Sequence, residues 1–203
     1  MFTHIKDFYR GETALQQLDG VAPLALRLFL APVMLQSGWT KLVGFENTVA
    51  WFEHSLGLPF PEVMAALAVG TEVVGGILLL LGLGIRFITI PLMVVMLVAA
   101  FMVHWENGWL ALSDASSWLA NDRVLDAVEK KQRIIATLRE HGNYQWLTSS
   151  GPVTILNNGI EFAITYFVML LSLFFTGGGR YLSLDYWLMK STDPKTKESL
   201  MQN

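Results

Sequence analysis

The sequence contains no cysteine, and this absence excludes several kinds of chemistry. Disulfide bonds, thiolate metal sites, iron–sulfur clusters and thiol-relay catalysis all require cysteine side chains. The histidines show no paired spacing of the kind that haem or zinc ligands have; they are His4, His54, His104 and His141. We therefore predict no metal and no haem, and any redox chemistry must use a diffusible cofactor or one that a partner holds.

Charged residues are also scarce. They make up only 15% of the 203 residues, whereas soluble domains have about 25%. Hydrophobic residues make up 53%, and this balance favours lipid as the surroundings. The formal net charge is −3 and the basic residues form no dense run, so the chain lacks the positive surface that nucleic-acid binding needs. These counts exclude a nucleic-acid-binding protein and favour an integral membrane protein.

The apolar residues gather in four blocks that are long enough to cross a membrane. A bilayer core of about 30 Å requires roughly 20 apolar residues per helix. The blocks cover about residues 22–42, 62–83, 87–103 and 155–176. Prolines precede and glycines follow several of them, as is usual at helix ends. The sequence predicts one all-α domain over residues 1–203, an integral membrane bundle of four helices.

Two segments between the blocks predict helices outside the membrane core. Residues 45–56 carry apolar side chains at helical spacing but are too short to span, so we expect an amphipathic helix on the outer surface. The long outer connection, about residues 104–154, contains a predicted helix at 121–141 with Asp122 as N-cap and Gly142 as C-cap. An apolar stripe on this helix could dock on the bundle or on a partner, or the connection could be a solvated lid: Val124, Val128, Ile135 and Leu138 form the stripe.

Basic residues near the spans select the cytoplasmic side of the membrane, and four spans put both chain ends on one side. Six basic residues fall on the side of the termini: Lys6, Arg10, Arg27, Arg86, Arg180 and Lys190. Against these stand, on the other side, Lys41, Arg123 and Arg139, and the other basic residues of that side lie deeper in the long connection, where the rule weakens. That other side also carries six of the seven tryptophans, as an interfacial belt does: Trp39, Trp51, Trp105, Trp109, Trp118 and Trp146. Both termini are therefore predicted to be cytoplasmic.

Ionisable side chains inside the blocks are the strongest functional signal. Arg27, Glu72 and Glu161 lie there, although each charged residue near a helix centre costs about 2.5–3.5 kcal/mol on insertion scales. Arg27 and Lys41 should share one helix face, because their spacing places them roughly 40° apart around the axis. Small residues lie on the face of Glu72, and the fourth block carries a polar stripe that cannot face lipid: Thr154, Asn157, Glu161, Thr165 and Ser172.

We infer a polar cavity between the helices, open toward the outer side. Its lining residues are Glu72, Glu161, Lys41 and His104. The candidate catalytic residues are Glu72, Glu161 and His104, and the candidate substrate-binding residues are Lys41, Trp39, Arg27 and Asn157. Glu72 is the strongest candidate, because its depth of roughly 16 Å below the outer edge of its span leaves no route to water.

Simpler interpretations remain for each of these ionisable residues. Arg27 can be a structural partner or a side chain that reaches the membrane surface, and Lys41 can be an interface anchor. His104 ends its helix and can be an interfacial residue or a proton carrier. A Glu72–Arg27 pair that only fixes the helix register also stays open.

The order and spacing of certain residues in the first three blocks resemble the DoxX family. The first block supplies Arg27, Gly38 and Lys41, and the second supplies Glu72, Gly75, Gly76, Leu79, Leu80 and Gly82, followed by Arg86 and by His104 at the end of the third. The likeness covers the first three spans by motif and the fourth by topology. The insertion at about 106–152 is larger than the family core needs, and it resembles a subgroup found with the biosynthesis of modified metal-binding peptides.

This resemblance implies a small bacterial inner-membrane subunit linked to quinone redox chemistry, as in thiosulfate:quinone oxidoreductase. On this hypothesis Glu72 and Glu161 handle protons, Lys41 and His104 hold the head group or an anionic substrate, and a partner protein supplies electrons. We expect the chain to bind a redox or periplasmic partner protein or a second copy of itself. The alternative is a non-catalytic membrane scaffold whose outer loop docks a periplasmic or membrane partner. Export is less favoured, because no inverted repeat or pair of broken helices is visible. Fold resemblance alone does not establish a reaction.

Overall fold

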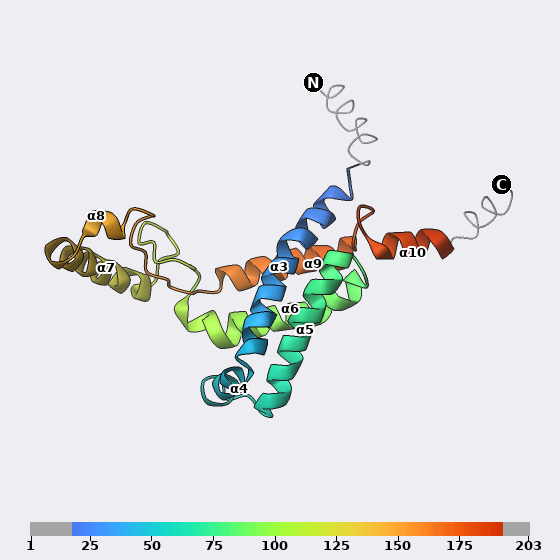
Figure 1. Ribbon diagram of the computed structural model, residues 1–203, viewed down its shortest axis with the longest axis horizontal. Coiled ribbons are helices and arrows are strands. Elements are labelled where there is room, and N and C mark those ends of the chain that lie inside the picture. The colour runs from blue at the N-terminus through green and yellow to red at the C-terminus, as the bar shows by residue number, and fades with distance from the viewer. Residues whose placement is uncertain (1–17, 193–203) are drawn as a thin grey trace, which may run out of the picture. The chain divides into compact units, whose positions relative to one another are not determined.

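The structure, a computed structural model, describes residues 18–192 (Figure 1). Lys6 and Arg10, which the orientation prediction counts, lie outside the described residues, as does His4. The chain divides into two compact units. The first unit runs up to Val95 and resumes at Tyr166, and the second unit is Met96–Thr165.

Among residues 18–192, three helices are long and apolar enough to cross a membrane. They are α3 (Val21–Val43), α5 (Pro61–Leu81), and a third span that begins with α6 (Ile85–Val98). The third span continues through a π-helix, η1 (Ala99–His104), and a 3₁₀ turn, η2 (Trp105–Asn107). The prediction of these spans is confirmed to within a few residues, and His104 ends the π-helix.

The fourth apolar helix, α9 (Glu161–Thr176), begins six residues later than the sequence predicts. Its 16 residues span about 24 Å at 1.5 Å per residue. The preceding backbone is not helical because the N–H groups of residues 157–161 bind carbonyl groups of residues 108–111 instead. Asn158 also has a positive φ of 59°, which a helix does not allow. Thr154 and Asn157 therefore do not belong to the polar face of α9, and that part of the prediction is wrong.

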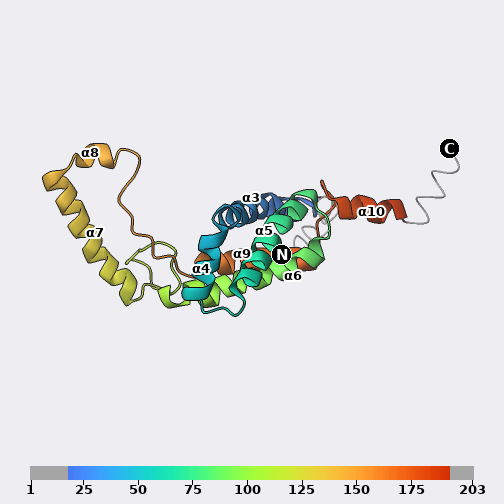
Figure 2. The same cartoon turned by 60° about the horizontal axis from the view of Figure 1, so that its bottom comes forward.

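The first unit is built around α3 and α5, which lie side by side in both views (Figures 1 and 2). Glycines let the two helices approach closely. A Cβ atom on Gly76 would come within 2.6 Å of Leu35 Cγ, and one on Gly38 within 2.8 Å of Val73 Cγ2. Small residues at the contact are typical of membrane helix pairs, so the predicted role of this face is confirmed.

The remaining apolar helices attach to this pair within the first unit. Leu92 of α6 fills the space beside Gly75 of α5, and the rings of Phe29 on α3 and Tyr166 on α9 lie 6.3 Å apart between centroids. Fully buried leucines and alanines occupy the contacts between helices: Leu30, Ala31, Ala65, Leu79, Leu92, Leu170 and Leu173. Other apolar side chains point outward, such as Phe87, which is 81% exposed. Outward apolar side chains are what a lipid-facing surface requires.

Four short or polar helices complete the described chain. They are α4 (Phe45–His54), α10 (Leu184–Thr192), α7 (Asp122–His141) and α8 (Tyr144–Leu147). The two predicted helices between the apolar blocks are thus confirmed, their place on the outer side of the membrane stays a prediction, and α4 contacts α3 and α5. The cap of α7 differs from the prediction: the side chain of Asn121, not Asp122, accepts the N–H of Val124. Gly142 is the C-cap, as predicted.

Candidate functional site

An ion pair lies buried between the two central helices of the first unit. The Nζ atom of Lys41 on α3 lies 2.8 and 2.7 Å from the two carboxylate oxygens of Glu72 on α5. Lys41 also donates to the hydroxyl of Ser37, one turn earlier, at 2.7 Å. Three acceptors match the three N–H groups of an ammonium, so Lys41 is fully satisfied. The predicted convergence of Lys41 and Glu72 is confirmed.

The two partners differ in their access to the surroundings. The side chain of Glu72 is 2% exposed, whereas that of Lys41 is 24% exposed. The close approach at Gly38 makes the pair possible, because a Cβ atom there would lie 3.0 Å from Cβ of Glu72. Glu72 therefore meets its surroundings chiefly through Lys41. Ser37 is a site residue that the sequence interpretation missed, although its spacing of four residues from Lys41 could have indicated it.

Arg27 does not pair with Glu72, which excludes the predicted register-fixing pair. It is fully buried, and every N–H group of its guanidinium donates to a backbone carbonyl. Its acceptors belong to the last turn of α5 and to the chain that follows α9. The bonds run from Nε to Leu79 (2.8 Å), from Nη1 to Gly178 (2.8 Å) and Tyr181 (3.3 Å), and from Nη2 to Leu80 (3.0 Å) and Leu182 (2.8 Å).

This carbonyl clamp has a structural purpose. The last carbonyls of a helix have no partner within the helix and carry its negative dipole end, so a buried cation stabilises them. Gly82 makes room, because a Cβ atom on it would lie 2.5 Å from Nη2 of Arg27. The alternative that Arg27 is a structural partner is confirmed. Substrate binding by Arg27 stays a prediction that this geometry does not favour, since no N–H group is left for a ligand.

Residues after α9 complete the junction around Arg27. The carboxylate of Asp185 accepts the N–H groups of Gly84 (2.8 Å) and Ile85 (3.1 Å) and thereby caps the start of α6. The hydroxyl of Ser183 donates to the carbonyl of Gly82 at 3.0 Å. The sequence interpretation missed these residues, because they are about 100 positions from their partners and no local pattern indicates such pairing.

His104 and Glu161 are held by one network in the second unit. The Nδ1 atom of His104 lies 2.9 Å from the carbonyl oxygen of Asn158, and the N–H of Asn158 donates to the carbonyl of Ala111. The N–H of Ala111 in turn donates to Oε2 of Glu161 at 2.9 Å. Glu161 is the first residue of α9, whereas the sequence predicts it inside the fourth helix, in its outer half. The network fixes both side chains at the end of an apolar helix.

The contact of His104 determines what its ring can do. A carbonyl accepts only, so Nδ1 carries the proton and Nε2 of the neutral ring is left as a proton acceptor. His104 also ends the π-helix η1, and π-helical turns occur frequently at functional sites. This π-helix was not predicted from sequence, since its irregular hydrogen bonds leave no mark on the apolar pattern.

Asn157 and Trp39 differ in how firmly they are held. Asn157 is buried, and its amide donates to the carbonyls of Asn107 (2.8 Å) and Leu110 (2.6 Å). Its carbonyl oxygen is buried and has no hydrogen-bond partner among the described residues. Trp39 is 63% exposed near the end of α3, as an interfacial tryptophan would be. Binding by either residue stays a prediction, as does a cavity that joins Lys41 and Glu72 with His104 and Glu161.

Charges outside the spans have shifted pKa values for local reasons. A side-chain hydrogen bond with Asp19 raises the pKa of Arg180 above its usual value. The hydroxyl of Ser116 donates to the carboxylate of Asp114 and lowers the pKa of that carboxyl. Among residues 18–192, no three histidine or acidic side chains gather in a way that could hold a metal ion.

Long apolar helices that bury a charged pair and a carbonyl-bound arginine define a helical membrane protein. The DoxX family model matches residues 22–105, from the start of α3 to η2. Residues 22–105 of this membrane protein are thus similar to the DoxX family, and the predicted resemblance is confirmed for that part of the chain. Its likeness to the subgroup with the larger insertion stays a prediction. The chain matches no curated protein and no solved structure.

Proposed function

We propose that this protein is the membrane subunit of a quinone-linked redox reaction and that Lys41 and Glu72 handle protons for it. The observation that carries the proposal is the Lys41–Glu72 ion pair, whose carboxylate is almost fully buried between apolar helices. A buried ion pair seldom gives more stability than an apolar pair of the same size. Ionisable residues within spans often serve proton transfer or substrate binding.

The residues of the pair fit a quinone head group. A bound quinone would supply the redox chemistry, because its reduction takes up one proton for each electron. Lys41 is the more exposed partner, and when its ammonium turns away from Ser37, the N–H donor that this frees can hold a carbonyl oxygen. Glu72 keeps Lys41 in place and can take a proton when Lys41 turns to a ligand. Electrons come from a partner protein, because the chain has no cysteine for a thiol or iron–sulfur carrier.

His104 and Glu161 are the proposed second proton-handling group. Their backbone contacts hold both side chains at fixed positions while leaving Nε2 of His104 as a proton acceptor. Trp39 and Asn157 are the remaining candidates for contact with the head group. The proposal places the protein in the bacterial inner membrane with both termini in the cytoplasm, as the basic residues favour.

Glu72→Gln tests the proposal, because it keeps the shape of the side chain and removes the charge. We expect the variant to remain folded in the membrane and to lose quinone-dependent turnover in membranes that contain the native partner. Protein purified in detergent should also carry extractable quinone in the wild type. The matched control is Glu62→Gln in the exposed first turn of α5, which should behave like the wild type.

Two results would contradict the proposal. Wild-type turnover in Glu72→Gln would remove the pair from the mechanism. Absence of quinone from the purified protein, together with a lower unfolding temperature for Glu72→Gln, would favour the scaffold alternative, in which the pair only holds α3 against α5. The scaffold alternative also requires that removal of residues 121–141 abolish capture of a partner.

A further inference from the structure

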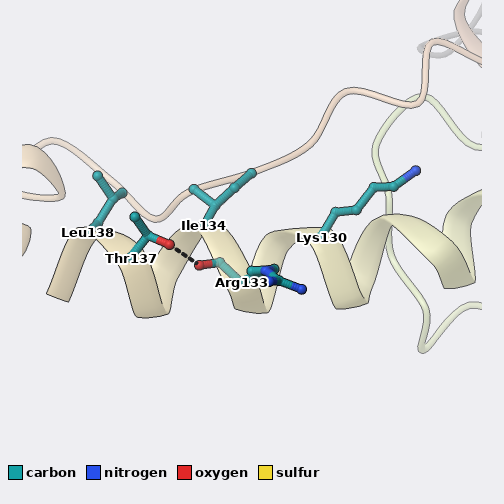
Figure 3. Close-up of a pocket in the computed structure, with 5 residues that line it drawn as sticks. All are labelled: Lys130, Arg133, Ile134, Thr137 and Leu138. Carbon is teal, nitrogen blue, oxygen red and sulfur yellow. Dashed lines mark hydrogen bonds between the residues drawn. The ribbon is translucent and has the colours of Figure 1, made fainter. Parts of the chain in front are cut away.

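The apolar stripe of helix α7 in the second unit, formed by Val124, Val128, Ile135 and Leu138, is widened on one side by Ala127 and Ile134, and the chain covers it most closely at its start. Val124 and Ala127 near the start are 1% and 8% exposed. Farther along, Ile134 is 44% exposed and lines an open hollow with Leu138. Figure 3 shows the side chains of Ile134 and Leu138 rising from the same side of the helix. The second half of the stripe is therefore only half-buried, and it has room for an occupant on the side of Ile134.

The charges of α7 are sorted around this stripe. At 100° per residue, four of the five basic residues lie within roughly 100° of its centre. These four are Arg123, Lys130, Lys131 and Arg139, and only Arg133 lies with the acidic residues. The acidic residues lie on the opposite face, roughly 140° or more from the centre: Asp122, Asp126, Glu129 and Glu140. Arg123, Lys130 and Arg139 flank the apolar stripe, and Lys131 lies within it. Basic side chains beside an apolar stripe fit a surface that is apolar inside and anionic at its rim, which is the chemistry of a phospholipid layer.

Exposed aromatic residues lie close to both ends of α7 in the sequence. Trp118 precedes the helix and is 90% exposed, and Trp146 follows it and is 72% exposed. Large exposed apolar side chains are unfavourable in water, whereas tryptophan is enriched at the boundary between lipid and water. Both rings thus favour the same kind of surface as the stripe.

The chain connects the segment that contains α7 to an apolar helix at each end. The second unit continues directly into the third apolar span on one side and into α9 on the other. Attachment at both ends makes docking an intramolecular event with a high effective concentration, so even a weak surface affinity is sufficient. The ion pair of Lys130 with Asp126 does not oppose docking, because exposed pairs of this kind contribute at most about 1 kcal/mol.

We propose that α7 lies on the surface of the bilayer that the protein itself crosses. Ile134 and Leu138 enter the headgroup region, and the flanking basic residues bind the phosphates of anionic phospholipids. The apolar face of such a helix reaches about 5–10 Å into the boundary between headgroups and acyl chains. The docked helix would hold the insertion in a fixed place relative to the membrane, and this inference does not depend on the quinone proposal.

The absence of native cysteine allows a direct test with single labels on the full chain. Ile134→Cys places an environment-sensitive fluorophore on the stripe, and Glu129→Cys places the same fluorophore on the opposite face as the matched control. Both proteins are reconstituted into phosphatidylcholine vesicles with and without phosphatidylglycerol, which contain lipids brominated near the headgroup. Leu138→Cys is a second stripe position in case the first label disturbs the helix.

We expect the stripe label to be quenched by brominated lipid several-fold more than the control label, and more strongly with phosphatidylglycerol. Lys130→Glu in the Ile134→Cys background should reduce the quenching. Equal quenching of stripe and control labels overturns the proposal. A stripe label that is shielded from aqueous iodide but not quenched by brominated lipid also overturns it, because a protein surface then covers the stripe. Equal quenching in the two kinds of vesicle overturns the role of anionic phosphates.

Discussion

The cations of Arg27 and Lys41 meet two different needs of the first unit. Arg27 binds only backbone carbonyls and joins the end of α5 to the chain after α9. Lys41 binds a carboxylate that is itself buried, and it is the part of that pair with access to the surroundings. The planar guanidinium of Arg27 suits the binding of several carbonyls, and the mobile ammonium of Lys41 suits a pair that can open. The structure thus separates a cation that stabilises from one that can react.

Arg27→Lys should destabilise the protein although it keeps the charge. An ammonium has three N–H groups at one point and cannot reach five carbonyls that belong to two separate segments. We expect a loss of at least about 3 kcal/mol, the order expected when a buried charge loses its partners. Thermal unfolding in detergent measures this loss in the free energy of unfolding.

Arg86→Lys is the matched control for this substitution. Arg86 is exposed and makes one long hydrogen bond, 3.3 Å, to the carbonyl of Phe175. The same change there should alter the free energy of unfolding by no more than about 0.5 kcal/mol. Similar losses in the two variants would show that the carbonyl clamp is not what the first unit depends on.

The buried face of each helix and the order of the helices could be predicted from sequence. Which residues meet across a pair of helices could not. The spacing of apolar and small residues correctly indicates which side of α3 and α5 is buried, because helical phase is a local property. Which residues on the facing sides meet depends on where the helices cross. Gly38 and Gly76 determine where α3 and α5 cross, and this crossing places Glu72 beside Lys41 and not beside Arg27.

Helix starts were harder to predict, as α9 illustrates. The sequence predicts that the fourth membrane helix begins at residue 155, yet the N–H groups of residues 157–160 bind a loop more than 40 positions away. The run Asn157-Asn158-Gly159 is a turn signal that could have indicated the break. Gly159 in particular is needed, because a Cβ atom there would lie 2.5 Å from two carbonyl oxygens of that loop.

Gly38→Ala should separate α3 from α5 at the ion pair. The added methyl would lie 2.8 Å from Val73 Cγ2 and 3.0 Å from the Val73 backbone nitrogen, which cannot move without moving α5. We expect a loss of about 1–3 kcal/mol, the usual cost of overpacking, measured by thermal unfolding in detergent.

Gly70→Ala on α5 provides the comparison, because nothing lies within 4 Å of the atom that it adds. Helix propensity then predominates, and alanine should stabilise the helix by up to about 1 kcal/mol. Opposite signs for the two variants are therefore expected. If both stabilise, α3 and α5 do not approach at Gly38 as the structure has them.

At the scale of the whole molecule, the insertion is closed at its base by hydrogen bonds within the second unit, which join residues 108–113 to residues 155–161. The DoxX match ends at residue 105, and the chain returns to α9 through hydrogen bonds between residues 108–111 and 157–161. An antiparallel bridge between Leu112 and Leu156 and a hydrogen bond from Ser113 to Ile155 close this base. The direct partners of His104 and Glu161, Asn158 and Ala111, lie on the α9 side of the bridge. From beyond the bridge, the N-cap residue of α7, Asn121, reaches this side through a hydrogen bond to the carbonyl of Asn107.

This arrangement implies that residues 114–154 can be replaced by a two-residue Asn-Gly turn. Ser113 and Ile155 already pair as the ends of a hairpin do, and Asn-Gly favours the turn that joins such ends. We expect an unfolding temperature in detergent within about 4 °C of the wild type, which corresponds to about 1 kcal/mol in a chain of this size. A longer deletion, residues 109–156, removes Ala111 and the base itself, so it should lower the unfolding temperature much further. Equal losses in the two deletions would mean that α7 supports the membrane helices directly, and the insertion would then be part of the core and not an addition to it.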